Sequence, residues 1–265
     1  MVVNWNVHVG HGNVADLIEA VTRRERASGF GPPEFVFLLQ ESFRRGSEVP
    51  TSTRPGVPRR IAPPSFAIDI EDIARDFGWW MYYVPSMRNG DRAGEEAEDR
   101  GNAILSSLPL EKLHAVELPF VVQRRVALMA TVTDARRKPM LRVGVAHLDT
   151  RAPLSRGWIL GGPAARTRQA QAIVAEIENF DADVPLVLGA DLNTQFGRGE
   201  GAVEAISKVL ARADCGKAST HTSGLLLDHM FARVPEGWPT PRCVRLDGTF
   251  GSDHYPLMLP FQIPS

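Results

Sequence analysis

With 265 residues, 43% of them hydrophobic, the chain is long enough to bury a large core, and no linker rich in Pro, Gly or Ser divides it. Its formal net charge of -1 excludes a strongly basic coat for nucleic acid, although local basic patches can still steer such a substrate. No apolar run approaches the roughly 20 residues that cross a bilayer, which excludes a helical membrane protein.

Length, composition and charge lead to expectations about the domains, the oligomeric state and the location of the protein. We expect a single domain over residues 1–265 and a soluble, monomeric protein. No basic, hydrophobic leader opens the chain, which fits a cytoplasmic protein and equally a secreted one whose leader lies outside this sequence. Cys215 and Cys243 match no paired zinc-ligand spacing, and we expect free or buried thiols. The sequence does not say whether they can pair, and a disulfide would favour secretion.

The first elements along the chain are a strand, a helix and a second strand. Residues 2–9 predict a strand, and Asn13 is placed to cap a helix whose apolar residues recur from Val14 to Val21. Residues 35–39 are continuously apolar, as in a strand that is buried on both faces. Glu41 follows that run, so we expect its carboxylate at the end of a rigid strand.

Two charged segments interrupt this regular pattern. Residues 42–65 contain several prolines and have no helical or alternating period, so we expect a long basic loop, either solvated or facing a polyanion. Its arginines are Arg44, Arg45, Arg54, Arg59 and Arg60. A helix over residues 70–77, stopped by Gly78, and a strand over 79–84 follow it. Residues 88–100 then predict another loop.

The remainder of the chain is dominated by predicted strands. They cover residues 101–106, 113–118, 125–133, 140–147, 185–190, 225–231, 243–246 and 257–259, with Asp228 inside its strand. Helical periods cover residues 166–178 and 202–210. Many strands with few helices predict an α/β (α+β) fold in which two mixed β-sheets pack face to face and helices flank them.

Polar groups recur where these strands end, which predicts one shared site. In chain order the motifs are Trp-Asn, Gln-Glu, Gly-Asn-Ala-Ile-Leu, His-Leu, Gly-x-Asp-x-Asn, Leu-Asp-His and Ser-Asp-His-x-Pro. From Trp5 to Pro256, this order resembles the endonuclease/exonuclease/phosphatase superfamily, the deoxyribonuclease I-like proteins. The resemblance implies a four-layer α/β sandwich and the hydrolysis of phosphoester bonds.

The residues themselves suit that chemistry. Glu41 is a hard oxygen ligand without a Cys/His cluster around it, which suits Mg²⁺, with Mn²⁺ or Ca²⁺ as alternatives. The resemblance places Asn6 and Asp253 on the metal side with Glu41, for one metal or two. Nuclease relatives often carry an acid where this chain has His8, which puts a metal contact at that position in doubt.

The resemblance also assigns the groups that act on the phosphate. Asp191 orients or deprotonates the attacking water, while the buried Asp228 holds His254 in its tautomer and favours its charged form. His147 and Asn193 donate to the phosphoryl oxygens, and Asn102 contacts the phosphate or supports the site.

Three functions fit these residues. The first is a nuclease that hydrolyses DNA or RNA by in-line attack of an activated water. The second is a lipid phosphodiesterase similar to sphingomyelinase, or an inositol or small-molecule phosphatase. A lipid enzyme needs an exposed apolar loop; Phe43, Phe66 and Trp158 are its candidates, although we expect them to be buried. The third, a binding module without turnover, predicts missing catalytic positions, yet all are present.

Overall fold

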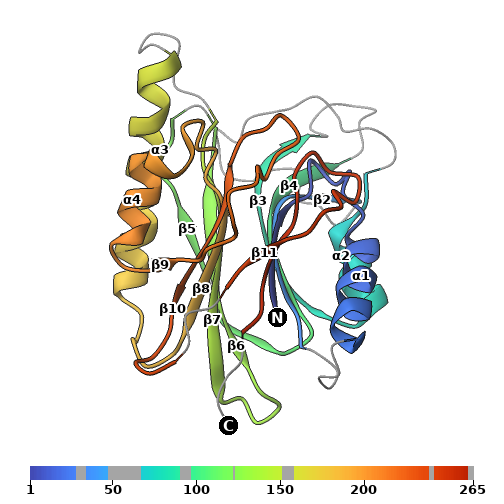
Figure 1. The fold of residues 1–265 in the computed structure, drawn as a ribbon. Coiled ribbons are helices and arrows are strands. Elements are labelled where there is room, and N and C mark those ends of the chain that lie inside the picture. The colour runs from blue at the N-terminus through green and yellow to red at the C-terminus, as the bar shows by residue number, and fades with distance from the viewer. Residues whose placement is uncertain are drawn as a thin grey trace.

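The computed structural model of the chain describes residues 1–27, 34–46, 67–89, 97–121, 123–150, 158–238 and 242–261. Two six-stranded mixed sheets pack face to face, with one pair of helices outside each sheet (Figure 1). The predicted sandwich with flanking helices is therefore confirmed. Within the described ranges, no helix combines the length and the apolar character needed to span a membrane.

The first sheet lies against helices α1 (Val14–Ala27) and α2 (Ile70–Phe77). Its strands, in spatial order, are β11 (Val244–Arg245), β12 (Leu257–Leu259), β1 (Val2–Asn6), β2 (Val36–Arg45), β4 (Glu98–Ser106) and β3 (Trp80–Asn89). Asn13 caps α1 by accepting the Asp16 amide at 3.2 Å, and Gly78 ends α2 with a φ of 63°. Both helix signals read from the sequence are confirmed.

The second sheet lies against helices α3 (Trp158–Glu178) and α4 (Gly201–Ser207). Its strands, in spatial order, are β5 (Leu110–Glu117), β6 (Val126–Thr133), β7 (Pro139–His147), β8 (Leu186–Asp191), β10 (Asp228–Arg233) and β9 (Ala211–Arg212). A 3-10 turn, η2 (Gly197–Gly199), precedes α4. Asp228 thus begins its strand, whereas we expected it inside.

A close approach of the two sheets positions the site. The buried Asn4 points from β1 toward the second sheet and accepts a hydrogen bond from the Gln40 side chain at 2.8 Å. It packs on Gly189 of β8, where an added Cβ would lie only 2.5 Å from the Asn4 Oδ1. Two residues further along each strand, Asn6 Nδ2 donates to Asp191 Oδ2 at 2.8 Å. Because glycine has no side chain at position 189, β1 and β8 can approach closely enough for their ends to meet.

We predict that Gly189→Ala lowers the free energy of unfolding by about 1 to 3 kcal/mol, because an added methyl group overpacks this contact between the sheets. Gly199→Ala is the matched control, since a Cβ there would have no atom within 4 Å. Urea unfolding of both variants measures the difference. Equal stability of the two variants would show that the sheets adjust freely at this point.

The β2 strand corrects two expectations. It does not end at Glu41 but continues to Arg45, with a register shift against β4 between Leu39 and Ser42. Glu41 lies in this bulge with a φ of 55°, a backbone conformation that re-aims its side chain. The apolar run ends at Leu39, whereas the strand continues to Arg45, so the sequence pattern predicted the end of the strand too early.

The predicted basic loop is consequently wrong for its first residues. Arg44 lies in β2, paired with Asp99 of β4. Its guanidinium donates hydrogen bonds to Asp99 at 2.7 Å and to Glu71 at 3.0 Å, which stabilise this extended conformation. Residues 47–65 of that loop lie outside the described residues. The second predicted loop is shorter than expected, since β3 runs to Asn89 and β4 begins at Glu98.

The cysteines also correct an expectation. Cys215 and Cys243 form a disulfide with a Cα–Cα distance of 4.4 Å, so they are not free thiols. The bridge joins the segment after β9 to the segment before β11, and thus links an edge of one sheet to an edge of the other. A sequence separation of 28 gave no sign of this proximity.

Candidate active site

The site lies at one edge of both sheets. The parallel pairs β1–β2 and β7–β8 carry Asn6, His147 and Asp191 at the ends of their strands, and the antiparallel β10 begins beside them at Asp228. The loop before β12 adds His254, held by the Trp5 indole, which donates to the His254 carbonyl at 3.0 Å. Segments from both ends of the chain therefore meet at one place.

Asp191 stands at the centre of this cluster. Its Oδ1 accepts the Asn193 amide at 2.9 Å, and its Oδ2 accepts the Asn6 side chain at 2.8 Å. Burial raises the pKa of Asp191, and the negative charge of Asp228 raises it further, whereas His254 and the two hydrogen bonds act in the opposite direction. A carboxylate of raised pKa is a stronger base than an exposed one.

His254 is bound to Asp228 through one ring nitrogen. His254 Nδ1 lies 2.7 Å from Asp228 Oδ2, and both side chains are buried. Burial alone would lower the pKa of His254, but the charges of Asp228, Asp191 and Asp253 together raise it to about 10. The ring is therefore an imidazolium at neutral pH, and its Nε2 lies 3.9 Å from Asp191 Oδ2.

His147 connects Asp191 to Glu41. Its Nε2 lies 3.5 Å from Asp191 Oδ2 and 4.0 Å from Glu41 Oε1. Because both carboxylates lie beside the same nitrogen, they are close enough for one cation and its bound phosphate to bridge. The Glu41 side chain is 22% exposed, so solvent reaches this part of the site.

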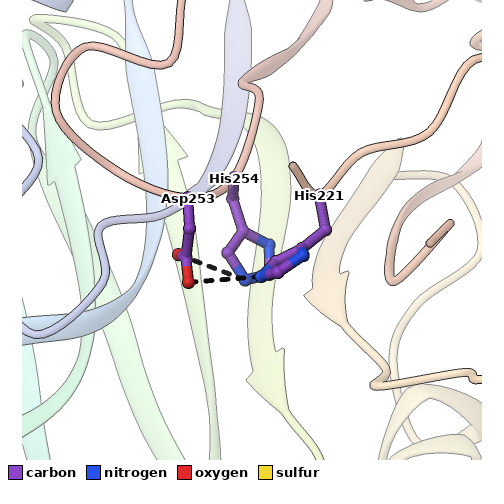
Figure 2. A group of neighbouring side chains, drawn as sticks. All are labelled: His221, Asp253 and His254. Carbon is purple, nitrogen blue, oxygen red and sulfur yellow. Dashed lines mark hydrogen bonds and ion pairs between the residues drawn. The ribbon is translucent and has the colours of Figure 1, made fainter. Parts of the chain in front are cut away.

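Asp253 contacts histidines (Figure 2). His221 Nε2 lies 3.2 Å from Asp253 Oδ2, and His254 Nε2 lies 3.8 Å from Asp253 Oδ1. His8 Nδ1 lies 3.5 Å from Asp253 Oδ1. The position at which nuclease relatives often carry an acid therefore places a histidine beside this carboxylate. No residue pattern in the sequence had pointed to His221, which is brought in by the loop before β10.

Two groups of side chains have the spacing that a cation requires. The ligand atoms of His221, Asp253 and His254 lie within 4.8 Å of one another, as do those of Asp191, Asp228 and His254. However, His221 Nδ1 accepts the Ser223 backbone N–H at 3.0 Å, so the ring proton is on Nε2, the atom that faces Asp253. In this tautomer His221 donates a hydrogen bond to Asp253 instead of ligating a metal.

The carboxylates are therefore the better donors for a metal. Asp253 Oδ1 is buried and accepts no hydrogen bond from the part of the chain that the structure describes. Asp253 and Glu41 each offer hard oxygen atoms, the kind of ligand that Mg²⁺, Mn²⁺ and Ca²⁺ prefer. The Asn6 Oδ1 already accepts the His8 amide at 2.9 Å, so a metal contact there would share this oxygen.

The two other predicted amides are partly engaged by the backbone. Asn193 Nδ2 donates to the Leu148 carbonyl at 3.0 Å, which leaves its second N–H for a phosphate oxygen. Asn102 Nδ2 donates to the Val126 carbonyl at 2.7 Å and so links β4 to the start of β6. This contact indicates a supporting role for Asn102, and a phosphate contact stays a prediction.

A fifth histidine, His229, follows Asp228 on β10 and yields a prediction about stability. Burial lowers its pKa from 6.5 to about 4. The Thr194 hydroxyl donates to the Leu226 carbonyl, so the His229 Nε2, 2.9 Å from Thr194 Oγ1, donates to that oxygen. Its Nδ1 is buried without a hydrogen-bond partner among the described residues, so a second proton would be unsatisfied. The unfolded chain binds this proton more readily than the folded one, so stability falls as the pH decreases from 6.5 toward 4.

Between pH 7 and pH 5 we expect this histidine to remove about 2 kcal/mol from the free energy of unfolding. His229→Gln lacks the titrating group, so its stability should change less over the same range. Urea unfolding of both proteins at the two pH values measures the difference. Identical pH dependence would mean that His229 is protonated as easily in the folded protein as in the unfolded one.

Comparison with known proteins identifies the family of the chain. The model of the Endonuclease/Exonuclease/phosphatase family matches residues 3–254. No curated protein matches the sequence significantly. The three solved structures described next share between 13% and 15% identity with the chain, so their likeness shows the fold alone.

The human Nocturnin catalytic domain with bound sulfate has a TM-score of 0.63 and 15% identity, over 99% of this chain and 93% of that one. D. rerio TDP2 complexed with single-strand DNA product has a TM-score of 0.56 and 14% identity, over 97% and 96%. A mannosyl-6-phosphatase from Bacteroides thetaiotaomicron has a TM-score of 0.58 and 13% identity, over 98% and 100%. The chain belongs to the endonuclease/exonuclease/phosphatase family, whose members hydrolyse phosphoester bonds.

Proposed function

We propose that the protein is a metal-dependent phosphodiesterase, a nuclease that hydrolyses DNA or RNA. The observation that carries this proposal is a chain of contacts of 3.5 to 4.0 Å, in which His147 Nε2 lies beside Glu41 and Asp191 and His254 Nε2 lies beside Asp191. A carboxylate base, two histidines that can donate N–H groups and an acid that can bind a cation are the groups that the hydrolysis of a phosphodiester requires.

Each residue has a part in this reaction. Asp191 accepts a proton from the attacking water, and its raised pKa makes it a better base near neutral pH. The N–H of His147 and the imidazolium of His254 stabilise the negative charge that grows on the non-bridging oxygens. A divalent cation bound through Glu41 and Asp253 would supply further positive charge to the phosphate.

Nucleic acid is supported as the substrate by an exposed aromatic side chain that lies close in sequence to a site residue. Phe196 is 62% exposed and follows Asn193 by three residues, which suits stacking on a base. D. rerio TDP2, which shares the fold, was solved with a single-strand DNA product. Of the loop residues named for a lipid enzyme, Phe43 is 1% exposed and cannot enter an interface, whereas Phe66 and the Trp158 side chain lie outside the described residues.

A phosphomonoesterase is the second candidate, since the similar Bacteroides protein is a mannosyl-6-phosphatase. A substrate panel separates the two. Plasmid DNA, single-stranded DNA and RNA, a sugar phosphate, an inositol phosphate and sphingomyelin vesicles are incubated with Mg²⁺, with and without chelator, beside Asp191→Ala. We expect cleavage of a polynucleotide by the wild type alone. Cleavage of only a phosphomonoester or lipid, or equal nuclease activity in the variant, would remove the nuclease proposal.

A further inference from the structure

Arg125, the residue just before β6, contacts the site from the inside of the protein. It is 4% exposed, and its guanidinium NH1 lies 2.9 Å from His147 Nδ1. Its Nε lies 3.4 Å from Asp149 Oδ1. The Arg125 carbonyl accepts the Leu118 amide at 2.9 Å, which fixes its backbone. The sequence marked Arg125 as the start of a strand and gave no sign of this contact.

The chemistry of the guanidinium decides where the His147 proton lies. An arginine side chain has five N–H donors and no acceptor, so His147 Nδ1 must accept the hydrogen bond with its lone pair. The ring proton of a neutral His147 is therefore on Nε2. This is the nitrogen that faces Asp191 at 3.5 Å and Glu41 at 4.0 Å. In the other tautomer the proton would be on Nδ1, and Nε2 would present a lone pair instead of an N–H to the site.

Arg125 is held on its far side by a second buried layer. Asp149 is 1% exposed, and its backbone N–H donates to Gln169 Oε1 at 2.9 Å. The Gln169 amide in turn donates to Asp149 Oδ2 at 3.3 Å and to the Pro119 carbonyl at 3.0 Å. Helix α3 thus fixes Asp149, Asp149 fixes the guanidinium, and the guanidinium fixes the imidazole.

The charge of Arg125 also fits this position. Burial lowers the pKa of its guanidinium, and the charges of Asp149, Glu41 and Asp191 act in the opposite direction. Arginine stays protonated in proteins, so it cannot become an acceptor for His147 at any working pH. A lysine or a histidine in its place would lack either the fork geometry or the permanent charge.

We propose that Arg125 is a positioning residue that holds His147 in the tautomer with its proton on Nε2, so that this N–H is directed at the substrate phosphoryl group. The part of the proposal that concerns the phosphoryl group rests on the proposed function, whereas the tautomer is a property of the protein alone. The two parts can therefore be tested separately.

The tautomer is tested by NMR on the metal-free, full-length protein labelled with ¹⁵N in its histidine rings, in which His147→Gln identifies the His147 signals. In the wild type we expect Nδ1 to be unprotonated and Nε2 to carry the proton. Arg125→Met should shift this population toward the other tautomer. Arg125→Lys, which keeps a donor without an acceptor, should retain the wild-type pattern.

Arg124→Met is the matched control, because the neighbouring arginine contacts Glu117 at 3.2 Å and the Pro85 carbonyl instead of the site. It should leave the His147 signals unchanged. Near-ultraviolet circular dichroism of each variant verifies that the fold is retained. An unchanged His147 tautomer in a folded Arg125→Met would overturn the proposal, whatever the substrate proves to be.

Kinetics test the consequence for the reaction. On the substrate that the wild type cleaves fastest, we expect Arg125→Met to lower kcat about 10- to 100-fold with KM within about twofold, because the donor acts on charge that grows in the transition state. Arg125→Lys should recover part of the loss. A changed tautomer with unchanged kcat would overturn the positioning role. A wild type that cleaves no phosphoester would refute the proposed function and leave the NMR result to decide the tautomer.

Discussion

Replacement of His254 by alanine is expected to lower kcat by about 10²- to 10⁴-fold, the contribution usual for a positioned acid or base. The reason lies in its surroundings: the imidazolium is buried, with its Nε2 3.9 Å from Asp191 Oδ2. Alanine removes the positive charge that would face the phosphate, and it removes the cation that Asp228 contacts at 2.7 Å. Fold disruption should be limited, because the Trp5 indole holds the His254 carbonyl and not its side chain.

The measurement is the steady-state hydrolysis of the preferred substrate by the variant and by His114→Ala. His114 lies on β5, and its side chain is 49% exposed and contacts Glu176 at 3.2 Å, so it controls for the loss of an imidazole outside the site. The control should retain full activity. Wild-type turnover in a folded His254→Ala would exclude this histidine from the mechanism.

Asp228→Asn is expected to produce a loss of similar size, because the carboxylate both orients His254 and favours its charged form. Asp228 is 2% exposed and lies 2.7 Å from His254 Nδ1. An asparagine amide has no negative charge, so it cannot hold the pKa of His254 at its raised value. It can also turn its NH₂ group toward Nδ1, which would reverse the tautomer.

A double-mutant cycle measures whether the pair acts as a unit. If it does, Asp228→Asn combined with His254→Ala should be about as active as His254→Ala alone, because the acid has no function without its partner. Multiplied losses in the double variant would indicate that Asp228 acts on the reaction independently. The pH-rate profile of Asp228→Asn should also show the alkaline limb displaced to lower pH, since the pKa of His254 falls.

Much of the fold was readable from the sequence. Continuous apolar runs such as residues 35–39 identified buried strands, and the Asn13 and Gly78 signals identified helix ends. The strand ends at Asn6, His147 and Asp191 do meet at one edge of the two sheets. Their catalytic and metal-binding roles stay predictions, as does the single domain over residues 1–265.

The rest depended on contacts that sequence patterns do not encode. The bulge at Glu41 comes from the pairing of β2 with β4, so the apolar run gave a strand end too early. His221 and Arg125 reach the site through loops and sheet packing, and neither has a local motif. The disulfide between Cys215 and Cys243 likewise requires that two sheet edges lie side by side.

We propose that the acids at this edge bind a divalent cation that the reaction needs, and a metal titration of Glu41→Gln is the experiment that examines this. Hydrolysis is measured against the Mg²⁺ concentration for the wild type, for Glu41→Gln and for Glu204→Gln, an exposed acid on α4 that serves as the control. We predict activity that chelator abolishes, and a titration displaced to higher Mg²⁺ in Glu41→Gln alone. A wild type that stays active in chelator would mean that the reaction needs no divalent cation, and a Glu41→Gln titration that coincides with the wild type would mean that Glu41 does not bind one.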